Sequence, residues 1–299
     1  MAVPSTASEP LVLVEKKGEF AVVRLNRLPV NALNTAVRPT EDLPSRGFGF
    51  SLVLAWVIHS GMILASSNQR VFSAGLDIME MYQPQVAPAK ISKFWTALQD
   101  LYLRLYTTRL ASVAAIEGHS PAGGCLLAMC CDYRIMTSGK PMIGLNETQL
   151  GIVAPTWFRD TFVNTIGHRQ AEKMLGLGLQ VDATKAKSIG LVDEAVALEE
   201  VFPRSEAAMG KWLAIPGALL FIEQWGEVIV SELTHFSINI ALSYPADMAR
   251  VRTKLLMRQE TADRLIAIRQ QDLEAFTDFA QTDKVQKSLG MYLASLKKK

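Results

Sequence analysis

The chain has 299 residues, which is enough for one large domain or two smaller ones. Lysine and arginine total 31 against 29 aspartate and glutamate residues, and this balance argues against a nucleic-acid-binding protein, which normally carries a clustered basic excess. With 49% hydrophobic and 20% charged residues the chain can bury a large core, so its composition excludes an intrinsically disordered protein.

Two windows, residues 48–65 and 213–244, are much more apolar than the rest of the chain. The first is about as long as a minimal membrane span, but it contains His59, Ser60 and two glycines. The second carries three glutamates near its centre, and charged side chains there are costly in lipid. We therefore predict no membrane-spanning segment.

Short apolar runs between turn signals predict a series of strands. Residues 11–14 and Phe20–Leu25 are β-rich and are separated by a glycine turn, which predicts a hairpin. Residues 62–66 and 112–116 predict two buried strands, each followed by a loop that contains glycine, and Tyr133–Thr137 predicts the next strand.

Helical patterns alternate with these strands. Residues 89–107 place apolar side chains at helical spacing, and residues 123–131 predict a short buried helix. Because strands alternate with helices, the predicted fold class is α/β, with helices and sheet in layers.

The second half of the chain is predicted to be mostly helical, with Gly176 and Gly178 as helix ends and residues 191–196 as one last strand. Residues 261–279 and Asp283–Leu296 predict two amphipathic helices. Their apolar faces are compatible with packing against a neighbouring subunit or on the chain's own core.

Several common motifs are missing from the sequence. There is no GxxxxGK[ST] loop, and Ala122-Gly123-Gly124 lacks the glycine spacing of a dinucleotide-binding turn. The four histidines are far apart, so no metal site is predicted. The three cysteines lie in one short segment and form neither a disulfide framework nor a CxxC pair for zinc.

A serine-hydrolase site is the main competing catalytic interpretation. Gly118-His119-Ser120-Pro121-Ala122 nearly matches the elbow G-x-S-x-G, and Asp132 and His168 follow in the expected order. In that elbow the residue after the nucleophile donates its backbone N–H to the oxyanion hole. Here that residue is Pro121, which has no N–H, so the sequence argues against a hydrolase.

Three segments combine into one chemical hypothesis. Residues 71–77 predict a strand that runs into a glycine turn, residues 121–126 predict a second glycine turn that opens a helix, and residues 143–151 hold Glu147 in apolar and neutral surroundings. Each feature alone is more typical of an ordinary tight turn or a surface charge.

Together, these segments predict enolate chemistry. Glycine turns let backbone N–H groups approach a ligand closely, and a helix that starts at Gly123 adds the positive end of its dipole. Such donors suit an oxygen that becomes negative during a reaction. An apolar pocket raises the pKa of a carboxyl group into the range that proton transfer needs, so Glu147 is the predicted proton carrier.

The same segments resemble those of a known family. Residues 72–77, 116–132 and 144–155 resemble the signature segments of the crotonase, or enoyl-CoA hydratase/isomerase, superfamily. Within it, the runs PAGGCLLAMCCDYR and IGLNETQLGIVAP are similar to the branch of Δ3,Δ2-enoyl-CoA isomerases. The resemblance implies a crotonase-like spiral of ββα units, a C-terminal helical region that forms a homotrimer, and a location in the mitochondrial matrix. It also implies an acyl-CoA thioester substrate of which coenzyme A is a part, so no separate cofactor is expected.

The resemblance further implies the roles of single residues. The backbone N–H groups of Leu76 and Gly123 would form the oxyanion hole, and Glu147 would be the catalytic carboxylate. The substrate would be lined by Ala74, Gly75, Leu76, Asp77, Ile78, Gly123 and Asn146, the last of which would flank the acyl group.

Leu126 distinguishes two activities within the superfamily. Hydratases place a second glutamate at this position, because hydration needs one group to activate water and another to hold it and deliver a proton. Leucine can do neither, whereas a single carboxylate can move a proton from C2 to C4 of a 3-enoyl chain. The resemblance therefore implies an isomerase that makes 2-trans-enoyl-CoA. The alternatives are an impaired isoform that acts only as an assembly partner and, less favoured, a hydratase.

The resemblance stops at residues 35–60 and at about 217–244, which include most of both apolar windows. We predict a spiral core over residues 1–210, atypical at 35–60, and a C-terminal helical region over residues 211–299 with an insertion at about 217–244. Proline and glycine in the first segment disfavour the helix expected there. Our hypothesis is that both segments are splice variants or gene-model errors.

Overall fold

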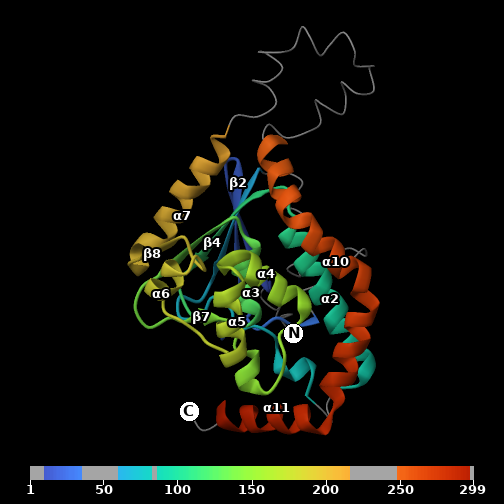
Figure 1. Cartoon of the computed structure of the whole chain (residues 1–299). Coiled ribbons are helices and arrows are strands. Elements are labelled where there is room, and N and C mark those ends of the chain that lie inside the picture. The colour runs from blue at the N-terminus through green and yellow to red at the C-terminus, as the bar shows by residue number, and fades with distance from the viewer. Residues whose placement is uncertain (1–9, 36–59, 83–85, 216–247, 297–299) are drawn as a thin grey trace, which may run out of the picture.

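A six-stranded β-sheet forms the centre of the fold (Figure 1). The computed structural model of the protein describes residues 10–35, 60–82, 86–215 and 248–296. Strands β1 and β2 are antiparallel, and every other pair of neighbours in the sheet is parallel. In sheet order, the strands are β1 (Val12–Lys17), β2 (Phe20–Leu25), β3 (Gly61–Ser66), β4 (Ala111–Ile116), β6 (Tyr133–Thr137) and β8 (Glu194–Val196).

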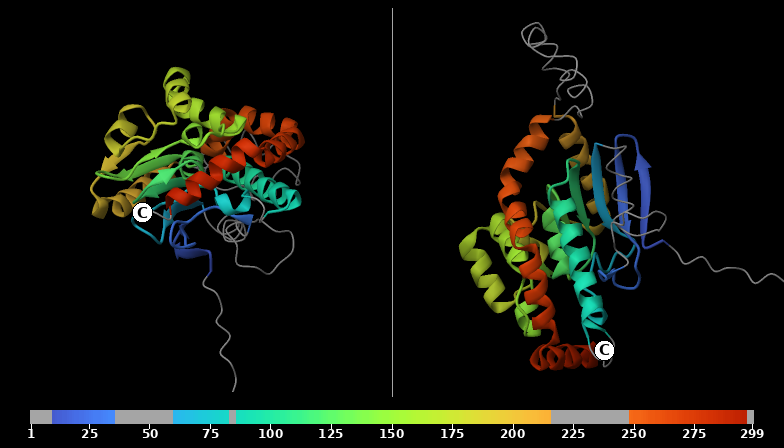
Figure 2. Two further views of the ribbon diagram at one scale, coloured as in Figure 1. Left: turned by 90° about the horizontal axis from the view of Figure 1, so that it is seen from below. Right: turned by 90° about the vertical axis from the view of Figure 1, so that its right-hand side faces the viewer.

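Helices cover both faces of this sheet (Figure 2). Every residue of β3 and β4 is buried, as expected for central parallel strands. Ile63 and Val113 pack on one face against Met209 of α7 (Leu198–Leu213), whereas Met62 and Leu64 belong to the larger core on the other face.

The larger core holds α2, α3 and α4, and α10 packs against α2 and α4. The remaining elements are α2 (Pro88–Tyr106), α3 (Gly123–Cys130), α4 (Thr156–Ile166), α5 (His168–Leu177), α6 (Ala183–Ser188), α10 (Met248–Gln281), α11 (Asp283–Leu296), the 3-10 helices η2 (Ile78–Glu80) and η3 (Glu147–Leu150), and a two-stranded pair of β5 (Ser120–Pro121) with β7 (Ile143–Gly144).

Most of the predicted elements are confirmed. The hairpin forms with Val12 opposite Leu25, the strands predicted at 62–66 and 112–116 each begin one residue earlier, and β6 has the predicted bounds. The predicted helix at 89–107 corresponds to α2, and the one at 123–131 to α3.

The prediction of two glycine helix ends is half right. Gly178 ends α5 in the left-handed conformation, with φ +60°, and its N–H bonds to the helix carbonyls. Gly176 lies inside α5, where the prediction of a helix end is wrong, and a side chain at that position would meet nothing within 4 Å. The last strand is also shorter than the predicted 191–196, because only Glu194–Val196 pair with β6.

Residues 71–77 do not form the predicted strand. Val71 makes only an isolated bridge with His119, and Leu76 makes another with Leu33. The backbone N–H groups of this segment bond in turn to different partners: that of Phe72 to His119 and that of Ala74 to Val30. No continuous ladder forms, because the segment passes between two neighbouring loops and does not follow one strand.

The first C-terminal helix is longer than predicted, since α10 begins at Met248 and not at residue 261. Its first turns bury cationic side chains, including Arg250 and Lys254, so they lack the apolar stripe from which a helix is predicted. Further along, the ring of Phe276 stacks on Trp95 of α2 with centroids 3.4 Å apart. The helix therefore packs on the core of its own chain.

The atypical segments at 35–60 and 217–244 lie outside the described residues, apart from Thr35 and Ser60. The division at residues 210 and 211 and the hypothesis on the origin of these segments stay predictions. In the described ranges, every helix is too short or too polar to cross a lipid bilayer.

A single carboxylate joins α10 to two other helices. Oδ2 of Asp272 accepts hydrogen bonds from Trp95 Nε1 at 2.7 Å, from Gln99 Nε2 at 2.7 Å and from Trp157 Nε1 at 3.4 Å. Trp95, Gln99 and Trp157 are buried, so they have no access to replacement water.

We expect Asp272→Ala to lower the free energy of unfolding by about 3 kcal/mol, because it leaves buried donors without an acceptor. The matched control is Asp278→Ala, at an exposed position of the same helix, which should change it by less than about 0.5 kcal/mol. Urea denaturation followed by circular dichroism measures both. Equal effects would contradict the role of Asp272.

Candidate active site

Two glycine turns meet at the amino end of α3. Gly75 has φ +85°, and a Cβ atom there would lie 2.9 Å from the backbone N of Gly123 and 3.0 Å from Cβ of Ala122. A Cβ atom on Gly123 would lie 3.2 Å from Cα of Gly75. The two turns can approach this closely only because both residues lack a side chain.

Two backbone donors at this contact have no acceptor within the described part of the chain: the N–H groups of Leu76 and Gly123. The two neighbours of Leu76 are bonded, since the N–H of Gly75 donates to Ser73 Oγ at 3.2 Å and that of Asp77 to the carbonyl of Leu33 at 2.8 Å. Gly123 is the first residue of α3, so its N–H lies at the positive end of the helix dipole. The pair is suited to bind an oxygen that carries negative charge.

The residue before α3 is held in an unusual conformation. Ala122 has φ +49°, which is uncommon for a residue with a side chain. Its N–H donates to the carbonyl of Gly144 at 2.8 Å, and β5 pairs with β7 immediately before it. Such strain, of order 1–3 kcal/mol, is typical of functional turns and persists here because the strand pair fixes the backbone.

The same strand pair brings Glu147 to α3. Glu147 begins η3 only three residues after Gly144, and its side chain is 6% exposed. Burial raises the pKa of the Glu147 carboxyl to about 7. Burial also raises the pKa of the Cys125 thiol on α3, and the nearby Glu147 carboxylate adds to that rise. The carboxylate therefore lies beside the helix that carries the Gly123 donor.

Two side-chain oxygens of this segment have no hydrogen-bond partner among the described residues: Oε2 of Glu147 and Oδ1 of Asn146. Unpartnered buried polar atoms are uncommon, and a ligand, an ion or an ordered water can satisfy them. Asn146 precedes η3, and its side chain does not cap the helix. Its predicted place beside an acyl group agrees with this unbonded oxygen but is not tested by it.

The segment predicted to line the substrate is placed at this contact, with Ala74, Leu76, Asp77 and Ile78 half-buried. The carboxylate of Asp77 accepts bonds from Arg27 Nη2 at 2.6 Å and from the N–H of Met79 at 3.0 Å, so it caps η2. In this structure the carboxylate holds the loop.

Two parts of the site were missed by the sequence analysis. Leu33 accepts from the N–H of Asp77 and donates its own N–H to the carbonyl of Gly75, so it brackets the glycine turn from both sides. On α11, Val285 and Leu289 are buried in an apolar cluster that Leu76, Ile78 and Ile152 also contact. No local signal marks Leu33. The amphipathic pattern of α11 predicts that one face is buried, but it does not identify the residues against which that face packs.

Leu126, which distinguishes the two predicted activities, is 1% exposed on α3 and belongs to the main core. It supplies no second carboxylate there. The residues that the structure describes contain no group of three or more histidine, cysteine, aspartate or glutamate side chains that could hold a metal ion. The chemistry that this geometry supports is proton transfer by one buried carboxylate next to a pair of oxyanion donors.

Comparison with known proteins defines the class. The family described as enoyl-CoA hydratase/isomerase matches residues 15–224, and the chain belongs to this family. The predicted crotonase fold is thereby confirmed. A crystal structure of enoyl-CoA hydratase EchA3 from Mycobacterium ulcerans shares it, with a TM-score of 0.65 at 20% identity over 91% of this chain and 98% of that one.

Individual relatives carry more specific names than the family does. The mouse protein named enoyl-CoA delta isomerase 1, mitochondrial, is 43% identical over 291 residues, which cover 96% of this chain and 88% of the mouse protein. The human protein of the same name is 44% identical over 238 residues, which cover 79% of this chain and 68% of the human one. The crystal structure of human mitochondrial delta3-delta2-enoyl-CoA isomerase superimposes with a TM-score of 0.79 at 39% identity, covering 96% and 98% of the two chains.

The burial of Glu147 predicts a cost in stability that depends on pH. The pKa of its carboxyl is raised from the ordinary value of 4.5 to about 7 on folding. Between these values the folded state keeps a proton that the unfolded state releases, so stability falls as pH rises. Glutamine does not titrate. We expect the unfolding free energy of Glu147→Gln, relative to the wild type, to increase by about 3 kcal/mol between about pH 4 and 8.

Denaturant titrations across this pH range measure the difference. The control is Glu172→Gln, whose side chain is 58% exposed and pairs with Arg169, and this variant should differ from the wild type by less than about 0.5 kcal/mol because a surface ion pair contributes little. A constant difference for Glu147→Gln would show that the carboxyl titrates normally.

Proposed function

We propose that the chain is a Δ3,Δ2-enoyl-CoA isomerase that converts 3-enoyl-CoA to 2-trans-enoyl-CoA in the β-oxidation of unsaturated fatty acids. The observation that carries the proposal is the buried carboxyl of Glu147, whose pKa is raised to about 7 and which lies beside a helix whose first N–H has no partner in the described chain. The names of the mouse and human relatives, enoyl-CoA delta isomerase 1, support it.

In this reaction Glu147 carries one proton between two carbons. Its carboxylate removes a proton from C2, and the electrons of that C–H bond move into the thioester to form a dienolate. The N–H groups of Leu76 and Gly123 stabilise the oxygen that becomes negative, and each such donor contributes about 3–4 kcal/mol in enzymes that depend on it. The same carboxyl then protonates C4, so the double bond moves and Glu147 returns to its first state.

The raised pKa suits both halves of this cycle. A catalyst that first removes and then returns a proton works best when its pKa lies near the working pH. A carboxyl group with the ordinary pKa of 4.5 would be a weaker base toward C2. Because Glu147 is buried without a cationic partner, the pKa of its carboxyl lies closer to the working pH.

We further propose how the substrate is held. The thioester and coenzyme A run along Ala74 to Ile78, mainly against backbone because the Asp77 carboxylate is engaged by Arg27. Asn146 flanks the acyl group, and coenzyme A is part of the substrate, so no separate cofactor takes part.

The assembly is proposed to be a homotrimer in the mitochondrial matrix. Leu256, Met257 and Ile266 of α10 are more than half exposed, which supports a subunit contact, and the mouse and human relatives are named mitochondrial. Light scattering tests the trimer, and fractionation of cells tests the location.

Hydration of 2-enoyl-CoA is the less favoured activity. More distant relatives, including a crotonyl-CoA hydratase from Syntrophomonas wolfei that is 28% identical over 212 residues, are named hydratases. Leu126 argues against hydration here, because it cannot hold or activate water.

We expect Glu147→Gln to reduce kcat for 3-hexenoyl-CoA by a factor of about 10³, because the amide can neither accept the C2 proton nor return it. The formation of 2-trans-hexenoyl-CoA is followed by ultraviolet absorbance. Glu172→Gln is the control and should keep the wild-type rate. Rapid hydration of 2-hexenoyl-CoA by the wild type, or full activity of Glu147→Gln, would contradict the proposal.

Gly75→Ala tests the oxyanion contact. The new methyl group would lie 2.9 Å from the N of Gly123, at a residue with φ +85°, so one donor must move. We expect kcat to fall by a factor of about 10² to 10³. Gly176→Ala is the control: its Cβ meets nothing within 4 Å, and it should keep the wild-type kcat while stabilising the helix by about 1 kcal/mol. An active Gly75→Ala enzyme would exclude this contact as the oxyanion hole.

A further inference from the structure

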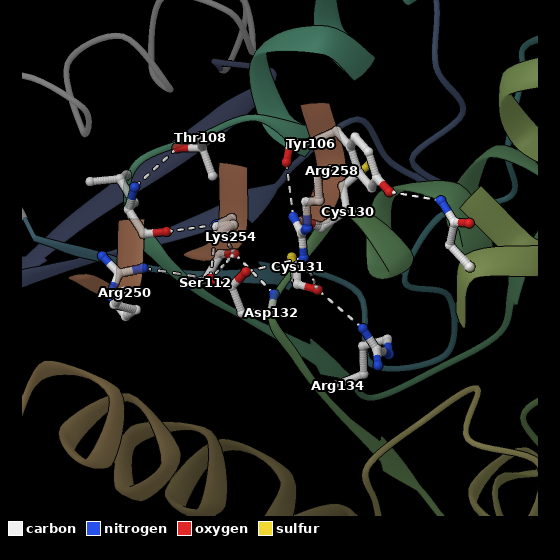
Figure 3. A network of polar contacts seen from close by, with 12 residues as sticks. Tyr106, Thr108, Ser112, Cys130, Cys131, Asp132, Arg134, Arg250, Lys254 and Arg258 are labelled. Carbon is white, nitrogen blue, oxygen red and sulfur yellow. Dashed lines mark hydrogen bonds and ion pairs between the residues drawn. The ribbon is translucent and has the colours of Figure 1, made fainter. Parts of the chain in front are cut away.

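The carboxyl end of α3 is held by a guanidinium group from α10 (Figure 3). Nη1 of Arg258 donates to the carbonyl of Cys130 at 2.7 Å and to that of Tyr106, at the end of α2, at 2.9 Å. Nη2 donates to the carbonyl of Cys131 at 3.3 Å and to Oδ1 of Asp132 at 3.1 Å. One side chain thus joins the carboxyl ends of two core helices.

A second cation on α10 completes this group. Nζ of Lys254 donates to Oδ2 of Asp132 at 2.8 Å and to the carbonyl of Leu110 at 2.9 Å. The Asp132 and Lys254 side chains are 4% and 6% exposed, and that of Arg258 is 14% exposed. Burial lowers the pKa of Lys254 to about 8, against the opposing effect of Asp132. Arg250 lies 4.0 Å from the same carboxylate, so three cations of α10 share Asp132 and positive charge is in excess at this end of α3.

Beyond the β5–β7 pair that fixes the backbone before its amino end, α3 is held mainly by apolar packing. Its eight residues, GGCLLAMC, carry no charged side chain, and no side chain caps its amino end. Apolar packing holds a helix against rotation and tilt less specifically than directed hydrogen bonds do. The directed bonds at the carboxyl end come from Arg258, with Arg134 adding one to the carbonyl of Cys131 at 3.1 Å.

We propose that Arg258 is a positioning residue for the oxyanion hole, acting through α3: it fixes the helix at its carboxyl end and thereby sets the direction and the positive potential of the Gly123 N–H at the other end. Asp132, which also accepts a bond from Lys254, holds Arg258 in place. The inference rests on the proposed function, in which Gly123 binds the thioester oxygen.

The expected size of the effect follows from the length of the helix. Eight residues at 1.5 Å each separate the two ends by about 12 Å. At an effective dielectric constant of about 20, a unit charge at that distance changes the stability of an enolate by about tenfold in rate terms. Loss of the directed bonds adds to this change.

Three variants test the proposal on the full chain. Arg258→Gln should lower kcat for 3-hexenoyl-CoA about tenfold and change KM by less than about twofold, because the charge acts on the developing enolate more than on the bound thioester. Arg258→Lys keeps the charge and should recover part of the loss. Arg264→Gln is the control: it removes an exposed guanidinium of the same helix that binds Asp160 at 2.9 Å, and it should keep the wild-type kcat.

A spectroscopic measurement separates positioning from a merely structural role. The thioester carbonyl of bound butyryl-CoA, which cannot isomerise, is read by infrared difference spectroscopy with a ¹³C label. Binding to the wild type should lower its stretching frequency through the two N–H donors. Arg258→Gln should move the frequency back toward its value in water, whereas Arg264→Gln should not.

A loss of kcat in Arg258→Gln with an unchanged carbonyl frequency would overturn the proposal, as would wild-type kcat in that variant. If Arg258→Gln does not fold, Arg258→Lys is compared with the wild type in its place. The kcat of the wild type together with the carbonyl frequency of the wild type in Arg258→Lys would then overturn the proposal. Failure of the proposed function is distinguishable: the wild type would then not isomerise 3-hexenoyl-CoA, whatever the carbonyl frequencies of the variants.

Discussion

The contact between Gly75 and the amino end of α3 is the constraint on which the site depends. It follows from the sheet: β3 and β4 are adjacent and parallel, so the loops that leave their carboxyl ends meet at one edge. One loop brings Gly75 and the other brings Gly123, and a Cβ atom on the first would lie 2.9 Å from the N of the second. The backbone thus forms a pair of donors without using a side chain.

Two of the buried carboxylates, Asp132 and Glu147, differ in their charged partners. Asp132 is bonded by Lys254 and Arg258, which make it an anchor for α10. Glu147 is as well buried, yet no cation faces it among the described residues, and its pKa rises to about 7. Burial alone therefore does not identify a catalytic acid. The absence of a compensating charge converts a costly buried group into one that exchanges a proton near neutral pH.

The sequence predicted the features that local rules determine. Gly75 and Gly123 were found because glycine is needed where backbones approach closely, and Glu147 because a lone carboxylate in an apolar run is unusual. It failed where the determining contact is distant. Leu33 brackets the glycine turn through backbone bonds that any residue could make. The buried face of residues 248–260 in α10 cannot be recognised from the sequence, because it carries cations. Asp132, the carboxylate that makes their burial favourable, lies more than a hundred residues away.

The C-terminal helices contact the site from two directions, so they are not a unit separate from it. At one end α10 bonds to the carboxyl end of α3, whose amino end carries the Gly123 donor. At the other end α11 packs on the loops of both reacting groups: Leu289 contacts the cluster that includes Leu76, and Ser288 lies against Gly151, which ends the 3-10 helix of Glu147. A displacement of these helices would change both donor and acid together. A contact on the exposed face of α10 would therefore affect the geometry of the oxyanion hole through Arg258.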